Sequence, residues 1–229
     1  MKRVVQQIEG WPLWVRVVLS FVFRFVCYAA MLWLALWNEA RPSASLPDAL
    51  LPAIPYWAWA DRYNYWIWLA AYVPFALWLL IRDPHRFSRY MVSSGLLALL
   101  RGACIAATGL GPVHGVDVNA GMDPAQRMKA FWELASPLGF FVQGKPSVYL
   151  TKDLFFSGHT STTGLLLLYL WKFPPARWVM LAAHGVVVAT VFLAHLHYTI
   201  DVLGAYAFTL ALFAVREGKP TGSVPLQRP

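Results

Sequence analysis

Long apolar runs alternate with short polar connections along most of this chain. A helix needs roughly 20 mainly apolar residues to cross the hydrocarbon core of a bilayer, and six runs approach that length. The pattern therefore predicts an all-α, polytopic membrane protein whose six transmembrane helices place both termini on one side. The expected spans are residues 17–37, 65–81, 87–110, 155–171, 178–196 and 198–215.

The connection between the third and fourth predicted spans, residues 111–153, is long. Connections of this length often act as lids or binding elements. Asp123 followed by Pro124 is a typical helix start and predicts a short helix over residues 125–134. Its apolar side chains suit two arrangements equally well, one on the membrane surface and one as a plug packed over the spans.

Composition supports this interpretation. Hydrophobic residues make up 59% of the 229 residues, charged residues only 13%, and the mean hydropathy is +0.50, whereas about a quarter of the residues of soluble domains are charged. One membrane domain over residues 17–215 fits this length, with a cytoplasmic or interfacial segment (1–16) before it and a flexible tail (216–229) after it. No small-residue cleavage site follows the first apolar run, so we expect a retained helix rather than a signal peptide. Cys27 and Cys104 lie inside apolar runs and are interpreted as packing residues.

The formal net charge of +8 is spread between apolar runs rather than gathered in one patch. This distribution argues against nucleic-acid binding and favours membrane orientation by basic residues. Arg82, Arg86 and Arg89 follow the second span, and Lys172 and Arg177 flank the turn after the fourth. By the positive-inside rule, these turns and both termini are predicted to be cytoplasmic.

Two short motifs at the opposite, outward ends of the spans carry the candidate chemistry: Ser157-Gly158-His159-Thr160 and His197-Tyr198-Thr199-Ile200-Asp201. His197 and Asp201 are four residues apart, so on a helix they share a face and can touch. A carboxylate bonded to one imidazole nitrogen leaves the other free to attack. His159 follows a predicted helix start, where backbone N–H groups favour an anion and an imidazole can protonate a leaving alkoxide. The motifs predict phosphoryl chemistry at a bilayer surface.

Other polar residues near the motifs allow more than one interpretation. Arg101 lies inside the third span, where a cation must pair or face a polar cavity, so it could contact a phosphate or carboxylate or serve a structural pair. Asp153 could bond a histidine or cap the fourth helix. His195 and His197 form a His-x-His sequence, but on a helix these side chains point apart and no third ligand is evident. We therefore predict neither a metal nor another cofactor.

The stretches Asp153-Leu-Phe-Phe-Ser157-Gly158-His159-Thr160 and Ala194–Val202 resemble the sphingomyelin synthase-like branch of the phosphatidic acid phosphatase type 2 superfamily. Two weaker similarities accompany them. Leu46-Pro47-Asp48 resembles the first-loop motif of that family, and Gly95 through Arg101 to Thr108 is similar to its third-span motif. The resemblance covers roughly Leu46–Ala214.

The resemblance implies that His197 is the nucleophile, Asp201 its orienting partner and His159 the second catalytic histidine. It also implies transfer of a phospholipid headgroup to ceramide, a diacylglycerol-type alcohol or water, without a metal, at the outer or lumenal leaflet. The expected location is a bacterial inner membrane with a periplasm-facing site. The candidates for substrate binding are Arg101, Asp153, Ser157, Gly158 and Tyr198.

Departures from the family pattern bear on the substrate. Phosphatases of the wider superfamily have an arginine six residues before the nucleophile, where this chain has Val191, and their Lys-to-Arg-Pro motif is absent. A phosphomonoester dianion needs such cationic contacts more than a phosphodiester does, so an intact phospholipid is favoured. Leu196 stands where animal members have a glutamate, which leaves headgroup and acceptor open. The alternatives are a lipid phosphate or isoprenoid phosphate phosphatase and, outside enzymes, a lipid-binding or scrambling protein.

Overall fold

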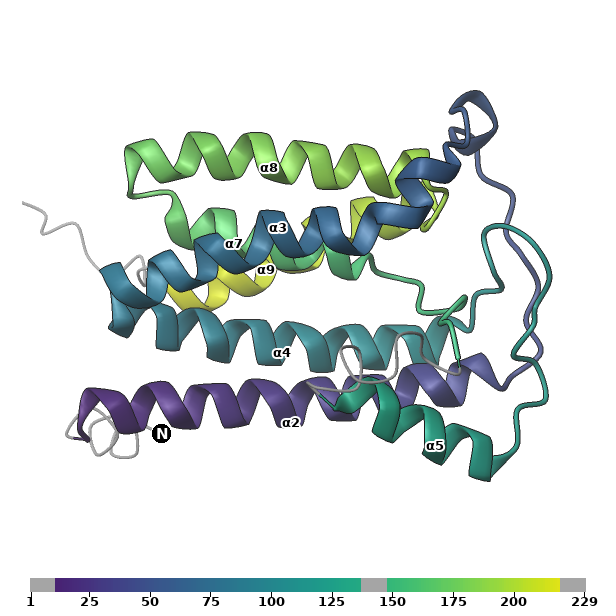
Figure 1. Ribbon diagram of the computed structural model, residues 1–229, viewed down its shortest axis with the longest axis horizontal. Coiled ribbons are helices and arrows are strands. Elements are labelled where there is room, and N and C mark those ends of the chain that lie inside the picture. Colours follow the sequence, from purple (N-terminus) through teal and green to yellow (C-terminus); the bar gives the residue numbers. More distant parts are fainter. Residues whose placement is uncertain (1–10, 137–147, 219–229) are drawn as a thin grey trace, which may run out of the picture.

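The computed structural model describes residues 11–136 and 148–218 of the chain, and every regular element in these two ranges is helical. Long helices run side by side in alternating directions (Figure 1), which confirms the all-α class. In chain order the elements are α2 (Leu13–Glu39), the 3-10 turn η1 (Leu51–Ala53), α3 (Ala58–Arg82), α4 (Pro84–Thr108), α5 (Pro124–Ala135), α7 (Gly158–Leu170), α8 (Pro174–Leu193) and α9 (Thr199–Glu217).

Five of the described helices are long and apolar enough to cross a membrane: α2, α3, α4, α8 and α9. The predicted span at residues 155–171 corresponds to α7, which has only 13 residues. At 1.5 Å per residue it is about 20 Å long, well short of the roughly 30 Å hydrocarbon core. A sixth span is therefore not confirmed. The apolar side chains of α7 are mostly buried against α3, α4, α8 and α9, so they contact other helices rather than lipid.

The termini of the chain depart slightly from the expected boundaries. Helix α2 begins at Leu13 and α9 continues to Glu217, so part of each predicted terminal segment (1–16 and 216–229) is helical. Residues 1–10 and 219–229 of those segments lie outside the described residues, and the predicted flexibility of the tail stays a prediction.

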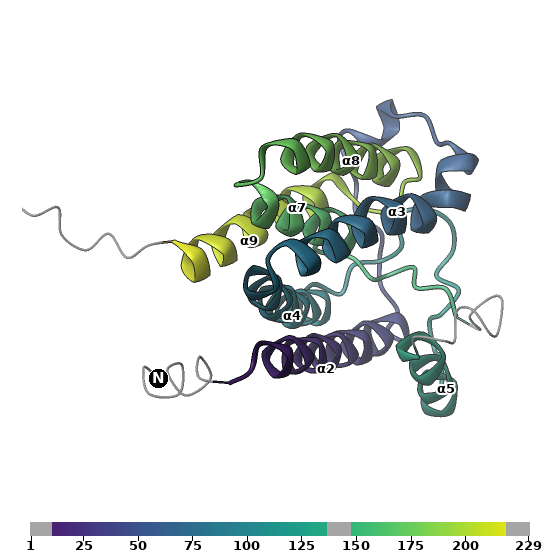
Figure 2. The same cartoon turned by 60° about the vertical axis from the view of Figure 1, so that its left-hand side comes forward.

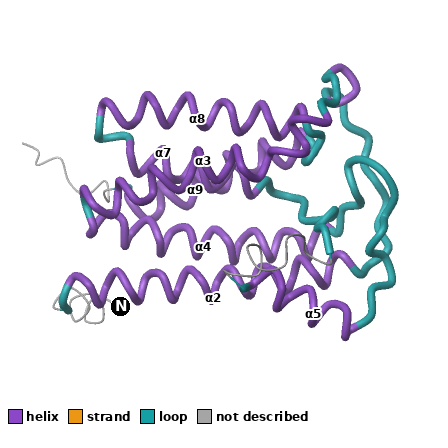
Figure 3. Tube along the Cα trace, in the orientation of Figure 1, coloured by secondary structure: helices purple, strands orange, loops and turns teal. Residues whose placement is uncertain are grey.

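The bundle has two ends that are easy to tell apart. The motif end is the end at which α7 and α9 begin and α2, α4 and α8 finish; the long connections gather there (Figure 3). The far end is the opposite one. The start of α2 and the end of α9 lie at the far end (Figure 1), as do the two basic turns after α3 and α7.

Close packing of α2 against α4 accounts for two glycines of the third-span similarity. A Cβ added at Gly102 would lie 2.9 Å from Cα of Met31, and one added at Gly95 would lie 2.9 Å from the Phe23 ring. Small residues at a helix interface allow such an approach between membrane helices. The α2–α4 pair is thus closely packed, and Arg101 lies on α4 in the half nearer the motif end.

Helix α5 confirms the short helix predicted in the long connection. Asp123 accepts a hydrogen bond from the Gln126 N–H at 2.9 Å, and Pro124 is the first helical residue. Ala130 and Ala135 of this helix are buried with Leu32 and Leu36 of α2 in one apolar cluster. In two views α5 lies beside the final turns of α2, away from α7 and α9 (Figures 1 and 2).

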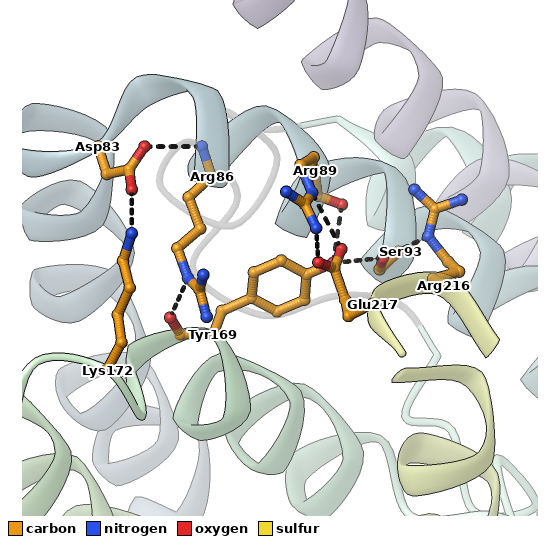
Figure 4. Close-up of polar contacts among 8 residues, drawn as sticks. All are labelled: Asp83, Arg86, Arg89, Ser93, Tyr169, Lys172, Arg216 and Glu217. Carbon is orange, nitrogen blue, oxygen red and sulfur yellow. Dashed lines mark hydrogen bonds and ion pairs between the residues drawn. The ribbon is translucent and has the colours of Figure 1, made fainter. Parts of the chain in front are cut away.

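At the far end, polar side chains join α4, α7 and α9 (Figure 4). The hydroxyl of Tyr169 donates to Glu217 at 2.6 Å and lies 2.7 Å from Oγ of Ser93. Arg89 pairs with Glu217, and Nε of Arg216 donates to Ser93 at 2.6 Å. These five residues, here called the far-end network, satisfy one another and fasten three helix ends together.

Candidate active site

The first motif forms the start of α7, as expected. Ser157 is the N-cap, and its hydroxyl oxygen accepts a hydrogen bond from the Thr160 N–H at 3.3 Å. His159 therefore lies in the first turn, beside backbone N–H groups and the positive end of the helix dipole. Its Nε2 atom is buried and has no hydrogen-bond partner among the described residues. An unused imidazole nitrogen at a helix N-terminus suits an anionic ligand.

Arg101 supports the segment that leads into α7. Its guanidinium contacts the carboxylate of Asp153 at 2.9 Å and donates to the backbone carbonyls of Asp153 and Phe156 at 2.8 and 2.6 Å. Arg101 thus pairs within the protein, and its predicted contact with a substrate stays a prediction. The capping interpretation of Asp153 is wrong, because Ser157 caps the helix and Asp153 is drawn instead to the buried cation.

Gly158 shows why this position carries no side chain. A Cβ added there would lie 3.0 Å from Cζ of Arg101 and 3.3 Å from its Nε. A larger residue would press on the guanidinium that holds the segment from Asp153 to Phe156. Glycine thus allows the start of α7 to lie directly against Arg101.

The second motif forms the start of α9, with one difference from the expectation. His197 precedes the helix, Tyr198 is the N-cap and Thr199 is the first helical residue. Nδ1 of His197 nevertheless lies 3.2 Å from Oδ2 of Asp201, and the same oxygen accepts the Tyr198 N–H at 3.1 Å. The predicted contact is present, but the reason given for it is wrong. Asp201 reaches back from the first turn, and the two residues do not share a helix face.

This pair has the geometry of an oriented nucleophile. Asp201 is fully buried, and His197 is 5% exposed. When Nδ1–H of the imidazole donates to an ionised carboxylate, Nε2 carries the free lone pair. The Asp201 carboxylate also stabilises positive charge that develops on the ring.

The fold brings the two motifs together. The backbone N–H of Ser157 donates to the carbonyl of Asp201 at 3.0 Å, which joins the cap of α7 to the first turn of α9. His159 follows Ser157 by two residues and His197 precedes Asp201 by four, so this bond brings both histidines to the same end of the bundle. A Cβ added at Gly204 of α9 would lie 3.0 Å from the Phe155 ring, so glycine permits this approach of helix and segment. All three predicted catalytic residues therefore belong to one site.

The remaining candidate for substrate binding, Tyr198, has its hydroxyl committed to the protein. It lies 3.1 Å from the carbonyl of Gly111 and 3.2 Å from that of Pro112, and it accepts the Leu46 N–H at 2.9 Å. The side chain is 2% exposed. Tyr198 thus ties two connections of the motif end to the start of α9.

Sequence reasoning missed one neighbour of the site. Trp68 of α3 meets the His159 ring edge-on, with ring centroids 5.5 Å apart, and its indole N–H donates to Thr162 at 2.9 Å. The chain has 12 tryptophans, and nothing in the pattern of its run distinguishes Trp68 from the others. Only the packing of α3 on α7 reveals the contact.

The two histidines of the His-x-His sequence take different partners. Nε2 of His195 lies 3.0 Å from the carbonyl of Ile54, whereas His197 contacts Asp201. In the part of the chain that the structure describes, no group of three or more His, Cys, Asp or Glu side chains is placed to hold a metal ion.

Comparison with known proteins supports the resemblance seen in the sequence. Residues 152–217, which hold both motifs, match the family described as PAP2 superfamily C-terminal. The chain is 30% identical over 146 residues to human phosphatidylcholine:ceramide cholinephosphotransferase 1, and this match covers 59% of the chain and 35% of the relative. The pig and rat proteins of the same name match at 30% identity over 146 residues, covering 59% of the chain and 34% of each relative.

The chain spans about a third of the length of the curated relatives it matches. These matches confirm the resemblance to the sphingomyelin synthase-like branch of the superfamily. Together with the five apolar helices, they identify an integral, multi-pass membrane protein.

Proposed function

We propose that this chain is a membrane lipid phosphotransferase that cleaves the headgroup from an intact phospholipid through a phosphohistidine. The observation that carries the proposal is the buried contact of His197 with Asp201, joined through the Ser157–Asp201 backbone bond to the helix start that presents His159. The likeness to ceramide cholinephosphotransferases supports a lipid phosphoryl-transfer enzyme of the same broad class.

In the first step, the lone pair on Nε2 of His197 attacks phosphorus and forms a P–N bond. The bond from phosphorus to the diacylglycerol oxygen breaks, and His159 gives a proton to that oxygen. Burial lowers the pKa of this imidazole to about 3, so the mechanism requires the anionic phosphodiester beside it to stabilise the protonated form. Asp201 accepts the hydrogen bond from Nδ1–H and stabilises the positive charge on the ring. The N–H groups in the first turn of α7 stabilise the phosphoryl oxygens.

In the second step, an acceptor hydroxyl attacks the phosphohistidine. His159, now neutral, takes the proton from that hydroxyl, and the P–N bond breaks to restore His197. A ceramide or diacylglycerol-type alcohol as acceptor completes a transfer, whereas water completes a phospholipase C-like hydrolysis. The same residues serve both outcomes, because the acceptor alone changes.

A phosphodiester is the favoured substrate because the site offers few cations. Val191 is a buried apolar residue of α8, and the guanidinium of Arg101 is occupied by Asp153 and two backbone carbonyls. A dianionic phosphomonoester would need more positive charge than this arrangement supplies.

The site is proposed to face the outer, non-cytoplasmic side of the membrane. The basic turns that hold Arg82, Arg86, Arg89, Lys172 and Arg177 all lie at the far end, opposite the motifs. Lys and Arg in short connections favour the cytoplasmic side. A bacterial inner membrane with a periplasm-facing site is part of the same proposal.

The experiment uses the purified full chain in liposomes with headgroup-labelled phosphatidylcholine or phosphatidylethanolamine, with and without ceramide. Labelled sphingolipid demonstrates transfer, and free phosphorylated headgroup with diacylglycerol demonstrates hydrolysis. Liposomes that contain labelled phosphatidic acid test the phosphatase alternative directly. Release of inorganic phosphate from phosphatidic acid, with no cleavage of the diesters, would overturn the diester assignment.

The matched variants are His197→Ala and His114→Ala. His114 is an exposed histidine of the long connection that stacks on Tyr56. We expect His197→Ala to lower the rate by at least about 10³-fold, as loss of a nucleophile does, and His114→Ala to leave it within about 2-fold. Full activity of His197→Ala would contradict the mechanism.

A further inference from the structure

Asp48, in the connection between α2 and α3, is bonded to the start of α9. One carboxylate oxygen accepts the backbone N–H of Thr199 at 2.6 Å, and the other accepts the Thr199 hydroxyl at 2.9 Å. The second oxygen also accepts the N–H groups of Leu50 and Leu51 at 2.9 and 3.0 Å. Residues 151 positions apart in the chain are thus joined at a point two residues after His197.

This contact supplies what the local sequence lacks. The first N–H groups of a helix have no partner within the helix and need an acceptor from elsewhere. The N-cap of α9 is Tyr198, which makes no side-chain cap, whereas Ser157 caps α7 from within its own chain segment. Asp48 therefore acts as an N-cap from a distant connection, and its negative charge suits the positive helix end.

The surroundings of Asp48 are built around the same helix start. Leu51, Leu154 and Tyr198 form a small buried cluster, which unites the Asp48 connection, the segment before α7 and the start of α9. Burial of Asp48 raises its pKa, but the hydrogen bonds from Thr199, Leu51 and Leu50 outweigh this and hold the pKa below its ordinary value of 3.8. The carboxylate is accordingly ionised, and an acceptor, throughout the neutral range.

We propose that Asp48 is a positioning residue for the His197–Asp201 pair. It holds Thr199 in place, and Thr199 lies midway between His197 and Asp201 in the chain, so its position affects the position of both. This inference rests on the proposed function, in which Nε2 of His197 must reach phosphorus. Because displacement of a reacting group by about 1 Å can cost roughly 10²-fold in rate, a loosened first turn of α9 lowers turnover without weakening lipid binding.

The test compares Asp48→Asn with Asp61→Asn in the full chain, in liposomes of labelled phosphatidylcholine. Asparagine keeps one acceptor but places an NH₂ group against a neighbouring N–H. Asp61 is a matched control, since it is a carboxylate at the motif end that accepts a bond from Tyr56 and none from α9. We expect Asp48→Asn to lower kcat by about 10- to 100-fold with KM within about 2-fold, and Asp61→Asn to change neither.

Hydrogen–deuterium exchange provides a readout that does not depend on activity. If Asp48 holds the start of α9, the peptide His197–Leu203 exchanges faster in Asp48→Asn, while peptides from α2 and α4 are unchanged. Faster exchange throughout the protein would mean a general loss of stability and would overturn the positioning role. An unchanged kcat would overturn it as well.

Thr199→Val sharpens the test because valine has the shape of threonine but cannot donate to Asp48. The backbone N–H bond remains, so we expect a smaller loss of kcat, of about 2- to 5-fold. The Asp48→Asn, Thr199→Val double variant should be no worse than Asp48→Asn alone, because both changes act through one contact. If the fold-losses of kcat from the two single variants multiplied in the double variant, the two residues would act independently, and the proposed shared contact would be contradicted.

The outcome of His197→Ala separates the two proposals. If His197→Ala abolishes headgroup cleavage and Asp48→Asn leaves kcat intact, only the positioning role fails. If His197→Ala keeps full activity, the proposed function fails, and exchange at His197–Leu203 still reports whether Asp48 holds this helix start.

Discussion

The two ends of α7 and α9 bury polar side chains in different ways. At the far end, the members of the far-end network satisfy one another across three helices (Figure 4). At the motif end, Nε2 of His159, Oγ1 of Thr160 and Oδ1 of Asp201 are buried without a hydrogen-bond partner among the described residues.

This difference between the far-end network and the motif residues supports the proposal that the motif end binds the substrate. A buried polar atom without a partner costs about 1–3 kcal/mol, and native proteins rarely carry such a cost without a reason. A satisfied network needs nothing more and serves to fasten helices. Unused atoms at a helix N-terminus, beside an oriented histidine, are instead available to a substrate.

The largest difference between the two ends is expected from the same isosteric change at each end of α9. We expect Asp201→Asn to lower headgroup cleavage by about 10³- to 10⁴-fold, because an amide holds the imidazole in the wrong tautomer. Glu217→Gln, in the far-end network, should leave the rate within about 3-fold and act on stability alone. Steady-state rates in liposomes measure both. Equal losses from the two variants would show that the ends do not differ in function.

A smaller effect is expected from paired glycine changes. Gly158→Ala places a Cβ 3.0 Å from Cζ of Arg101, and we expect about a 10-fold loss of kcat as the segment before His159 shifts. Gly185 of α8 has no atom within 4 Å of an added Cβ, so Gly185→Ala should keep the rate and add up to about 1 kcal/mol of stability. Rates and apparent Tm in detergent test the pair. The comparison is weakened if Gly158→Ala proves as harmless as Gly185→Ala.

The smallest effect concerns Asp83, at the far-end turn between α3 and α4. Partial burial raises the pKa of Asp83. The hydrogen bonds from Lys172, at 2.7 Å, and from the Arg86 N–H together lower it by more, so the pKa lies below its ordinary value of 3.8. A carboxyl with a depressed folded-state pKa stabilises the protein above its unfolded pKa, and this contribution is lost as the pH falls through the folded pKa.

Asp83→Asn keeps an N-cap for α4 but removes the ion pair with the half-exposed Lys172. We therefore expect a loss of about 0–1 kcal/mol near neutral pH and no change in kcat. The difference in apparent Tm between wild type and variant should shrink only as the pH falls below 3.8 and through the lower folded-state pKa of Asp83. A difference that grows on acidification would contradict the assigned direction.

Much of the fold followed from the sequence because membrane helices are long and apolar. The start of α5 at Asp123-Pro124 and the start of α7 at Ser157 were predictable from local capping rules, since each cap is made within a few residues. The length of α7 was not predictable from the sequence. A run buried by neighbouring helices and a run that faces lipid have the same composition, so apolar character alone could not tell them apart.

The candidate site likewise has residues that could be predicted from the sequence and contacts that could not. His159, His197 and Asp201 were identifiable from residue type and spacing, although His197 lies outside the helix that the spacing suggested. The pairing of Arg101 with Asp153, and the contact of Trp68 with His159, were not decidable, because these partners lie on separate helices or segments.

The amino-acid sequence was enough to predict an all-α membrane protein, the motif residues and the direction in which the basic turns bias its orientation. These properties depend on composition, on periodicity and on contacts between near neighbours in the chain. Three features became visible only in the folded chain: α7 is a short buried helix, Arg101 contacts the segment before His159, and Asp48 caps α9. Each of these depends on which distant segments meet, and at such a meeting a polar group finds its partner regardless of its distance along the chain.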